Sequence, residues 1–211
     1  ALDRFWEAKK SKWEMGRDYE RYIAYLLQKE GWHLVFRPFI DGFPDLSRLI
    51  LGRKAEKTLI CFARFFSPAK EVHQKLIQHF FIRGFEVAMQ EFGPSNPLLT
   101  SNSIIDNLRS GSIALRYISN GTLNSAGKDI SQAFGIQCQE SFPMEKYPSI
   151  KGTTGGDGEK RYFLPFDPEY DTLPAGESTP VEYVSSVEEA EAKGFSRVVK
   201  PSEKPDSDLF S

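Results

Sequence analysis

Gly16-Arg17-Asp18-Tyr19-Glu20-Arg21-Tyr22 is the stretch of sequence that decides the fold. It lies in a segment from about 4 to 30 in which aromatic and aliphatic residues recur near helical spacing, with charged residues between them. Gly31 follows and is a typical residue just beyond a helix end. The sequence therefore predicts either one long amphipathic helix or two helices joined near Gly16.

Three apolar runs come after this helix and predict β-strands. They cover residues 32–36, 46–51 and 58–66, and the third is dense enough for a central strand buried on both faces. The segment Ile40-Asp41-Gly42-Phe43-Pro44-Asp45 separates the first two and predicts a turn, because Asp-Gly and Pro favour turn conformations.

A second helix is expected from Ser67-Pro68, with Ser as the N-cap and Pro at the first helical position. Apolar residues then repeat every four positions until Gly84, where we expect this helix to end. The remaining elements are a loop, a strand and a helix, expected at 92–111, 113–118 and 126–135. Together these elements predict a mixed α/β domain over residues 1–142.

Residues 143–200 differ from the preceding sequence in composition and predict a small β-β-α appendage that docks on the first domain. The glycine-rich stretch Gly152 to Gly158 lacks the Gly-Lys-Ser/Thr ending of a phosphate-binding loop, so a hairpin tip is expected there. Short strands are predicted at 161–166 and 181–184, followed by a helix capped by Ser186 and stopped by Gly194. Residues 201–211 predict a disordered tail.

Composition limits the function classes that the chain can belong to. The 211 residues carry 27 basic and 29 acidic side chains, a net charge of −2, so any nucleic-acid surface has to be a local patch. The two cysteines, Cys61 and Cys138, exclude a cysteine-rich zinc site and a disulfide framework.

No membrane span or signal peptide is visible, and we expect a cytoplasmic protein without a membrane segment within this chain. The sequence begins Ala1-Leu2-Asp3 without an initiator Met, which leaves open a removed upstream segment that served as a tag, a leader or a membrane tether.

Several motifs in the same order resemble the Mrr-like restriction endonuclease family of the PD-(D/E)xK nuclease superfamily. The residues that carry the resemblance are Gly16 to Ile23, Glu30-Gly31-Trp32, Asp45-Leu46, the apolar run before Phe66-Ser67, and Lys70-Glu71-Val72-His73. The later segments 146–151, 159–167 and 188–195 look like the downstream part of one bacterial or phage subgroup of that family. The resemblance implies a restriction-endonuclease-like mixed sheet flanked by helices, DNA as partner, and a role in defence against or processing of foreign DNA.

A nuclease of this type needs carboxylates that hold Mg²⁺ and a Lys beside the attacking water. Glu20 matches the family's acid on the first helix. Matching the acidic turn puts Leu49 at the position of the metal-binding Asp, with Asp45 or Asp41 as possible substitutes. The Gln/Glu-x-Lys motif falls on Phe62-Ala63-Arg64 or, one residue earlier, on Cys61-Phe62-Ala63. Phe cannot ligate Mg²⁺ and Arg stays protonated, so the resemblance predicts a degenerate site.

The candidate catalytic residues are therefore Glu20, Asp45 and Arg64, with Glu20 and Asp45 as Mg²⁺ ligands only if the protein is active. Each also has an ordinary structural interpretation, as a charge on a solvated helix face, a turn former and an ion-paired residue. Basic side chains on the two helices provide candidate DNA-binding residues, namely Lys12, Arg17, Arg21, Lys70 and Lys75. Acids are interspersed with them, so a salt-bridged helix face explains the same pattern.

Three functions remain open from sequence. The first is a degenerate nuclease-like protein that binds DNA but has lost or impaired metal-dependent cleavage, and the second is an active, divergent Mg²⁺-dependent endonuclease. The third is a protein-interaction module in which apolar residues fill the former cleft, with a protein partner or a homodimer. The appendage faintly resembles the small Ada-type zinc module but lacks its cysteines, so no zinc is expected.

Overall fold

The computed structural model describes residues 2–36, 49–93, 104–171, 173 and 181–197. The chain divides into two compact units, and the division falls between Tyr147 and Pro148. The sequence places this boundary near residue 142. The difference arises because residues 142–147 belong to the core of the first unit, where Tyr147 packs on the first long helix. The predicted tail 201–211 lies outside the described residues.

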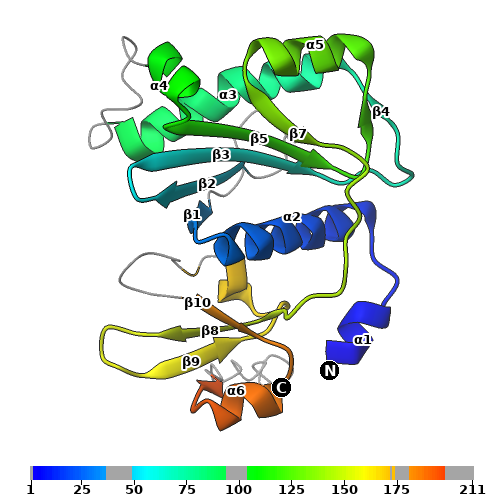
Figure 1. Cartoon of the computed structure of the whole chain (residues 1–211). Coiled ribbons are helices and arrows are strands. Elements are labelled where there is room, and N and C mark those ends of the chain that lie inside the picture. The colour runs from blue at the N-terminus through cyan, green and yellow to red at the C-terminus, as the bar shows by residue number, and fades with distance from the viewer. Residues whose placement is uncertain (1, 37–48, 94–103, 172, 174–180, 198–211) are drawn as a thin grey trace, which may run out of the picture. The chain divides into compact units, whose positions relative to one another are not determined.

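Unit 1 is a mixed sheet flanked by helices, as the sequence predicts (Figure 1). Its elements are α1 Leu2–Glu7, α2 Lys12–Lys29, β1 His33–Phe36, β2 Leu49–Lys54, β3 Lys57–Arg64, β4 Glu71–Val72, α3 Gln74–Phe92, α4 Ile104–Ser110, β5 Ile113–Ser119, β6 Thr122–Leu123, α5 Ser125–Ala133 and β7 Ile136–Gln139. The main sheet has the order β1-β2-β3-β5-β7. Its first three strands are antiparallel, whereas β3, β5 and β7 are parallel. This arrangement is consistent with a restriction-endonuclease-like fold.

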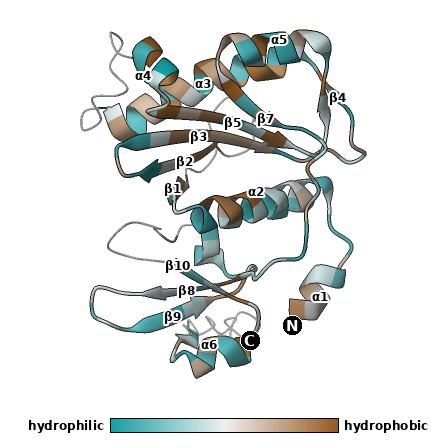
Figure 2. Cartoon of the chain, in the orientation of Figure 1, coloured by the Kyte–Doolittle hydropathy of each residue, from teal (hydrophilic) through white to brown (hydrophobic). Residues whose placement is uncertain are grey.

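The two faces of this sheet bury different clusters of side chains. Alternate residues of a strand point to opposite faces, and along β3 Cys61 and Ala63 pack with α2, while Ile60 and Phe62 pack with α3. Figure 2 shows β3 and β5 as the most continuously hydrophobic part of the sheet. β3 is buried on both faces because α2 covers one and α3, with α5 beside it, covers the other.

Three helix boundaries differ from the sequence prediction. The first helical segment breaks at residues 8–11 instead of at Gly16, because the Ser11 side chain caps the new helix α2 and Glu14 reaches back to the Ser11 backbone. The predicted start at Ser67 is wrong, because residues 71–72 form β4 and pair with β6, so α3 begins only at Gln74. The predicted stop at Gly84 is also wrong. A Cβ there would lie 2.9 Å from Ile60 Cγ2, so this glycine allows close packing of α3 on β3.

The other elements of unit 1 largely follow the prediction. The strands expected at 32–36, 46–51, 58–66 and 113–118 correspond to β1, β2, β3 and β5, and the helix expected at 126–135 is α5. The expected loop at 92–111 contains α4, and the edge strand β7 was not predicted. Both were missed because α4 has no buried residue to give it a periodic face and β7 has only four residues.

Unit 2 has a sheet of four short strands with one helix. Its elements are β8 Ile150–Thr154, β9 Lys160–Phe163, the 3₁₀ turn η3 Pro168–Asp171, β10 Val181–Val184, α6 Val187–Ala192 and β11 Ser196–Arg197, in the sheet order β10-β8-β9-β11. The glycine-rich stretch 155–158 is the tip of the β8–β9 hairpin, and Ser186 caps α6, as predicted. Gly194 follows α6 with a φ of 82°, a left-handed conformation that favours glycine.

Candidate functional site

The first half of α2 contains the stretch 16–22 and buries charged residues. Asp18, Glu20 and Arg21 are at most 9% exposed. Tyr19 lies against the sheet, where its ring packs on Phe65 and its hydroxyl donates a 2.9 Å hydrogen bond to the Phe142 carbonyl. α2 is therefore held between the sheet and the segment 142–147, and its polar residues are part of that packing.

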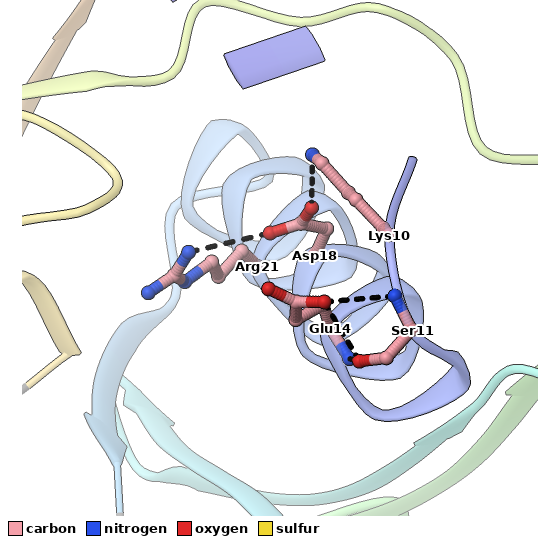
Figure 3. A network of polar contacts seen from close by, with 5 residues as sticks. All are labelled: Lys10, Ser11, Glu14, Asp18 and Arg21. Carbon is pink, nitrogen blue, oxygen red and sulfur yellow. Dashed lines mark hydrogen bonds and ion pairs between the residues drawn. The ribbon is translucent and has the colours of Figure 1, made fainter. Parts of the chain in front are cut away.

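Asp18 is the centre of a polar network on α2 (Figure 3). Lys10 Nζ lies 2.5 Å from one carboxylate oxygen and Arg21 Nη1 lies 3.3 Å from the other. The Lys10 ammonium also stands 3.7 Å from the centre of the Phe5 ring, which joins α1 to α2. Arg21 was a candidate DNA-binding residue. Its burial and its pairing with Asp18 give it a structural role, and we leave it out of the candidate DNA surface.

The structure separates the two possible registers of the Gln/Glu-x-Lys motif. Phe62 points to the α3 face, where it pairs with Leu49 on β2 and Tyr117 on β5. Cys61 and Ala63 point to the α2 face, the side of the sheet covered by the helix that carries Glu20. The register that goes with Glu20 thus has a thiol and a methyl group where a carboxylate and an ammonium are required.

Neither register fits a magnesium ion. Leu49, Cys61, Phe62 and Ala63 are at most 3% exposed and belong to the two apolar core clusters. Mg²⁺ requires oxygen ligands in near-octahedral geometry. In the part of the chain that the structure describes, no three His, Cys, Asp or Glu side chains come together as a metal site. Asp41 and Asp45 lie outside the described residues, so the predicted role of Asp45 stays a prediction.

Arg64 and Lys70 meet at one aromatic ring beyond the carboxyl end of β3. The Arg64 guanidinium lies 5.7 Å from the centre of the Phe66 ring, and the Lys70 ammonium lies 5.2 Å from it. The Asn120 side chain fixes the Phe66 backbone through two 2.8 Å hydrogen bonds, one in each direction. The two cations, one at the end of β3 and one in the loop that follows it, thus lie at the carboxyl ends of parallel strands, an edge where ligands commonly bind in open α/β sheets.

The remaining candidate cations belong to elements that start at this same end of unit 1. The first half of α2 lies at the end of β3, as the contact of Tyr19 with Phe65 shows, and α3 begins at the same end of unit 1 (Figure 1). Lys12 and Lys75 are exposed, and Arg17 is half-buried with its guanidinium 4.6 Å from the centre of the Trp13 ring. Glu71, also exposed, follows Lys70 in the sequence, so the acidic and basic residues of this surface, which we call the basic end, alternate. It consists of Lys12, Arg17, Arg64, Lys70 and Lys75.

Tyr117 is a buried polar residue that sequence reasoning did not single out. It is fully buried on β5, and no described residue meets the geometry of a hydrogen bond to its hydroxyl, although the Ser119 hydroxyl lies near enough to affect its pKa. Burial raises the pKa of Tyr117 to about 12, although the nearby Ser119 hydroxyl and Arg64 guanidinium act in the opposite direction. On sequence alone Tyr117 is one of several apolar residues in a strand, and nothing marks its hydroxyl as unpaired.

Comparisons with known proteins leave the family undetermined. No protein-family model matches the chain, and no curated protein is similar to it. Two solved structures resemble it weakly. One is EndoMS in its apo form, with 14% sequence identity, a TM-score of 0.36, and coverage of 65% of this chain and 49% of that one. The other is AF1548, a protein of unknown function, with 12% identity, a TM-score of 0.34 and coverage of 59% of each chain.

The chain spans about half the length of EndoMS and about three fifths of AF1548. Both TM-scores are too low for the likeness to support a statement about function.

Each helix in the described part of the chain is too short or too polar to cross a lipid bilayer.

Proposed function

We propose that this protein is an Mrr-like, restriction-endonuclease-like DNA-binding protein in which metal-dependent cleavage is lost or impaired. The observation that carries the proposal is the composition of the β2–β3 pair. On both faces of β3 the positions that the nuclease mechanism needs are buried and without carboxylates. The proposed setting is the defence against or processing of foreign DNA, as the family resemblance implies.

The loss of cleavage follows from the chemistry of these positions. Leu49 and Phe62 have no oxygen ligands, and the Cys61 thiol is a poor substitute because burial raises its pKa to about 12. A guanidinium is not a proton acceptor, so an arginine at position 64 cannot replace the lysine as a base. Positioned acid–base catalysis and electrostatic stabilisation each contribute about 10²-fold or more, so losing both makes cleavage slower by orders of magnitude.

DNA binding is supported by the basic end of unit 1. Arg64 and Lys70 converge on Phe66, and Lys12 and Lys75 are exposed on helices that begin nearby. Cations spread over the ends of several elements can contact successive phosphates of a DNA backbone. A net charge of −2 for the whole chain makes such a local concentration the feature on which binding depends.

A protein-interaction module is the second candidate, and it rests on two observations. The former cleft is filled on the α3 face, where the Phe62 ring stacks 5.4 Å from that of Phe80. In addition, Ile82 and Met89 on α3 are 56% and 41% exposed, and they stand seven residues apart on one side of the helix. A protein without DNA affinity that forms a homodimer or a complex through α3 would fit this alternative.

Fluorescence anisotropy with labelled duplex DNA tests DNA binding, and a plasmid nicking assay with Mg²⁺ or Mn²⁺ tests cleavage. We expect salt-dependent binding without cuts. The triple variant Lys12→Ala/Lys70→Ala/Lys75→Ala removes three cations from the basic end and should reduce the slope of log K against log salt by about 2 to 3, since each phosphate contact contributes about 0.9.

Lys57→Ala is the matched control, because Lys57 is exposed at the opposite, amino end of β3. An equal loss of binding in the control would contradict the placement of the surface. Cleavage that disappears in Glu20→Ala would show a rebuilt metal site and favour an active endonuclease. If the wild-type protein binds no DNA, the interaction module replaces the proposal.

A further inference from the structure

Trp13 is an exposed aromatic residue on the first turn of α2, beside the basic end. Its side chain is 54% exposed, the largest exposure of an aromatic residue in the described part of the chain. Its position is fixed, because the Ser11–Glu14 capping box sets the start of the helix at Lys12. Single exposed apolar residues are ordinary on protein surfaces. The neighbours of Trp13 make this one unusual.

The Arg17 guanidinium lies 4.6 Å from the centre of the Trp13 ring, one helical turn further along α2. A cation over an indole is attracted by the negative face of the ring, and the contact holds both side chains in place. The cation can cover one face only. The rest of the indole remains exposed, so a flat, ordered aromatic surface stands next to a positive charge.

Gly16 leaves bare backbone three residues from Trp13, on the same side of the helix. Glycine inside a helix is less favourable than alanine, and it is usually retained where another group must approach closely. Among the described residues no such group is found, since a Cβ added at Gly16 would meet no atom within 4 Å other than those of its chain neighbours and its own helix backbone. The space beside Trp13 is therefore open towards solvent.

The charges around this surface favour a polyanion over a neutral partner. Lys9 and Lys12 are exposed and lie within four residues of Trp13 in the sequence, and the Arg17 guanidinium lies over its ring. Two acids belong to the same stretch of sequence. Glu14 is engaged with Ser11, which holds its pKa below the ordinary value of 4.5, and Glu7 ends α1. Lys10 is paired with Asp18 and contributes little.

We propose that Trp13, Gly16 and Arg17 form a stacking platform for an unpaired base of single-stranded DNA, with Lys12 and Arg17 contacting the adjoining phosphates. This inference rests on the proposed DNA binding and adds a preference for unpaired strands. An exposed indole stacks on any base because every base has a π face, and this contact requires the base to be out of the duplex. The close approach of the sugar–phosphate backbone uses the space that Gly16 leaves open.

The test compares a labelled oligo(dT) of about 20 nucleotides with a duplex of the same length, by anisotropy and by quenching of tryptophan emission. We expect tighter binding of the single strand, and Trp13→Ala should weaken that binding about five-fold or more while changing duplex binding by less than about two-fold. Trp13→Phe should retain most of the binding and lose most of the quenching. Gly16→Leu should weaken single-strand binding through steric exclusion.

Phe166→Ala is the matched control. Phe166 is also an exposed aromatic residue with an arginine near its ring, but it belongs to unit 2. If the wild-type protein binds single strands and Trp13→Ala binds them equally well, the platform is wrong while the proposed function stands. Equal losses on single-stranded and duplex DNA would also overturn it, as would about ten-fold tighter binding of oligo(rU) than of oligo(dT). Absence of binding to both forms of DNA would overturn the proposed function itself.

Discussion

The two faces of the central sheet in unit 1 differ in how their buried polar side chains are paired. On the α2 side, Asp18 is buried together with Lys10 and Arg21, and the Tyr19 hydroxyl has a carbonyl partner. On the α3 side, Leu49, Phe62 and Phe80 pack as an apolar core, and the Tyr117 hydroxyl has no partner among the described residues. The chain can therefore bury carboxylates where cations accompany them. The β2 and β3 positions that the proposed function assigns to a former nuclease site are buried core residues.

The largest loss of stability is expected when a carboxylate is introduced on the α3 face of the sheet. Phe62→Glu should destabilise the protein by about 4 kcal/mol or more, because it buries an unpaired carboxylate and removes an aromatic ring from the core. Urea denaturation measures the change. Ile82→Glu is the control on the same side of the sheet and should stay within about 0.5 kcal/mol, since Ile82 is exposed. A Phe62→Glu variant as stable as the wild type would contradict this difference between the faces, because the α3 face would then have to be accessible to water.

A smaller loss is expected when the charge network on the α2 face is broken. Asp18→Ala removes the carboxylate that both Lys10 and Arg21 contact and should cost about 3 kcal/mol, as for one partner of a buried pair. Arg161→Ala, which disrupts an exposed pair with Asp157 and Glu159, should cost less than about 1 kcal/mol. Equal costs for the two variants would show that the α2 network does not depend on burial.

Alkaline titration distinguishes buried groups from exposed ones on both faces. Burial raises the pKa of Cys61 from 9.0 and that of Tyr117 from 10.0, in each case to about 12. The folded protein then retains protons that the unfolded chain releases, so stability is fully present below pH 9 and falls as the pH rises from about 9 to 12. The slope is about 1.4 kcal/mol per pH unit for each group.

Thermal unfolding at successive pH values measures this decline. Cys61→Ala should reduce the decline between pH 9 and 10, where tyrosine contributes little, and the pKa of Cys138, which burial also raises, accounts for the remainder. A stability that stays constant to pH 11 would contradict the burial of both groups.

The smallest effect is expected from removing single hydroxyl groups. Tyr19→Phe deletes the hydrogen bond to the Phe142 carbonyl and should cost about 1 kcal/mol. Tyr117→Phe deletes a hydroxyl without a partner among the described residues and should be neutral or slightly stabilising. Both rings are fully buried, so the pair is matched in packing. A loss in Tyr117→Phe as large as in Tyr19→Phe would mean that the α3 face satisfies its polar groups as the α2 face does.

The sequence predicts the mixed sheet well because its strands carry strong local signals. β3 is a continuous apolar run, which indicates a strand buried on both faces. The start of α3 could not be predicted, since Ser67-Pro68 has a good capping pattern and only the pairing of β4 with the distant β6 overrides it. The predicted end of α3 at Gly84 was wrong for a similar reason, because a local sequence pattern does not show that Gly84 packs closely on Ile60.

The roles of the candidate site residues stay predictions. The family resemblance aligns Leu49 and Phe62 with acidic or amide positions, and the basic character of Lys70 can be read from the sequence. Which register of Cys61 to Arg64 shares a face with α2 was not evident from the sequence, because a shift of one residue reverses the face of a strand. The burial of Arg21 was also hidden, since a charged residue on a helix gives no sign that Asp18 will pair with it.

One plasmid assay tests the central claim most directly. Purified protein is incubated with supercoiled and linear DNA at low salt in Mg²⁺ or Mn²⁺, beside Glu20→Ala and Arg64→Ala. We expect the protein to shift the mobility of the DNA without cutting it, and we expect Arg64→Ala to bind the DNA more weakly. Metal-dependent cleavage that Glu20→Ala abolishes would contradict it, because oxygen ligands would then have to reach the metal from positions other than the buried β2–β3 pair.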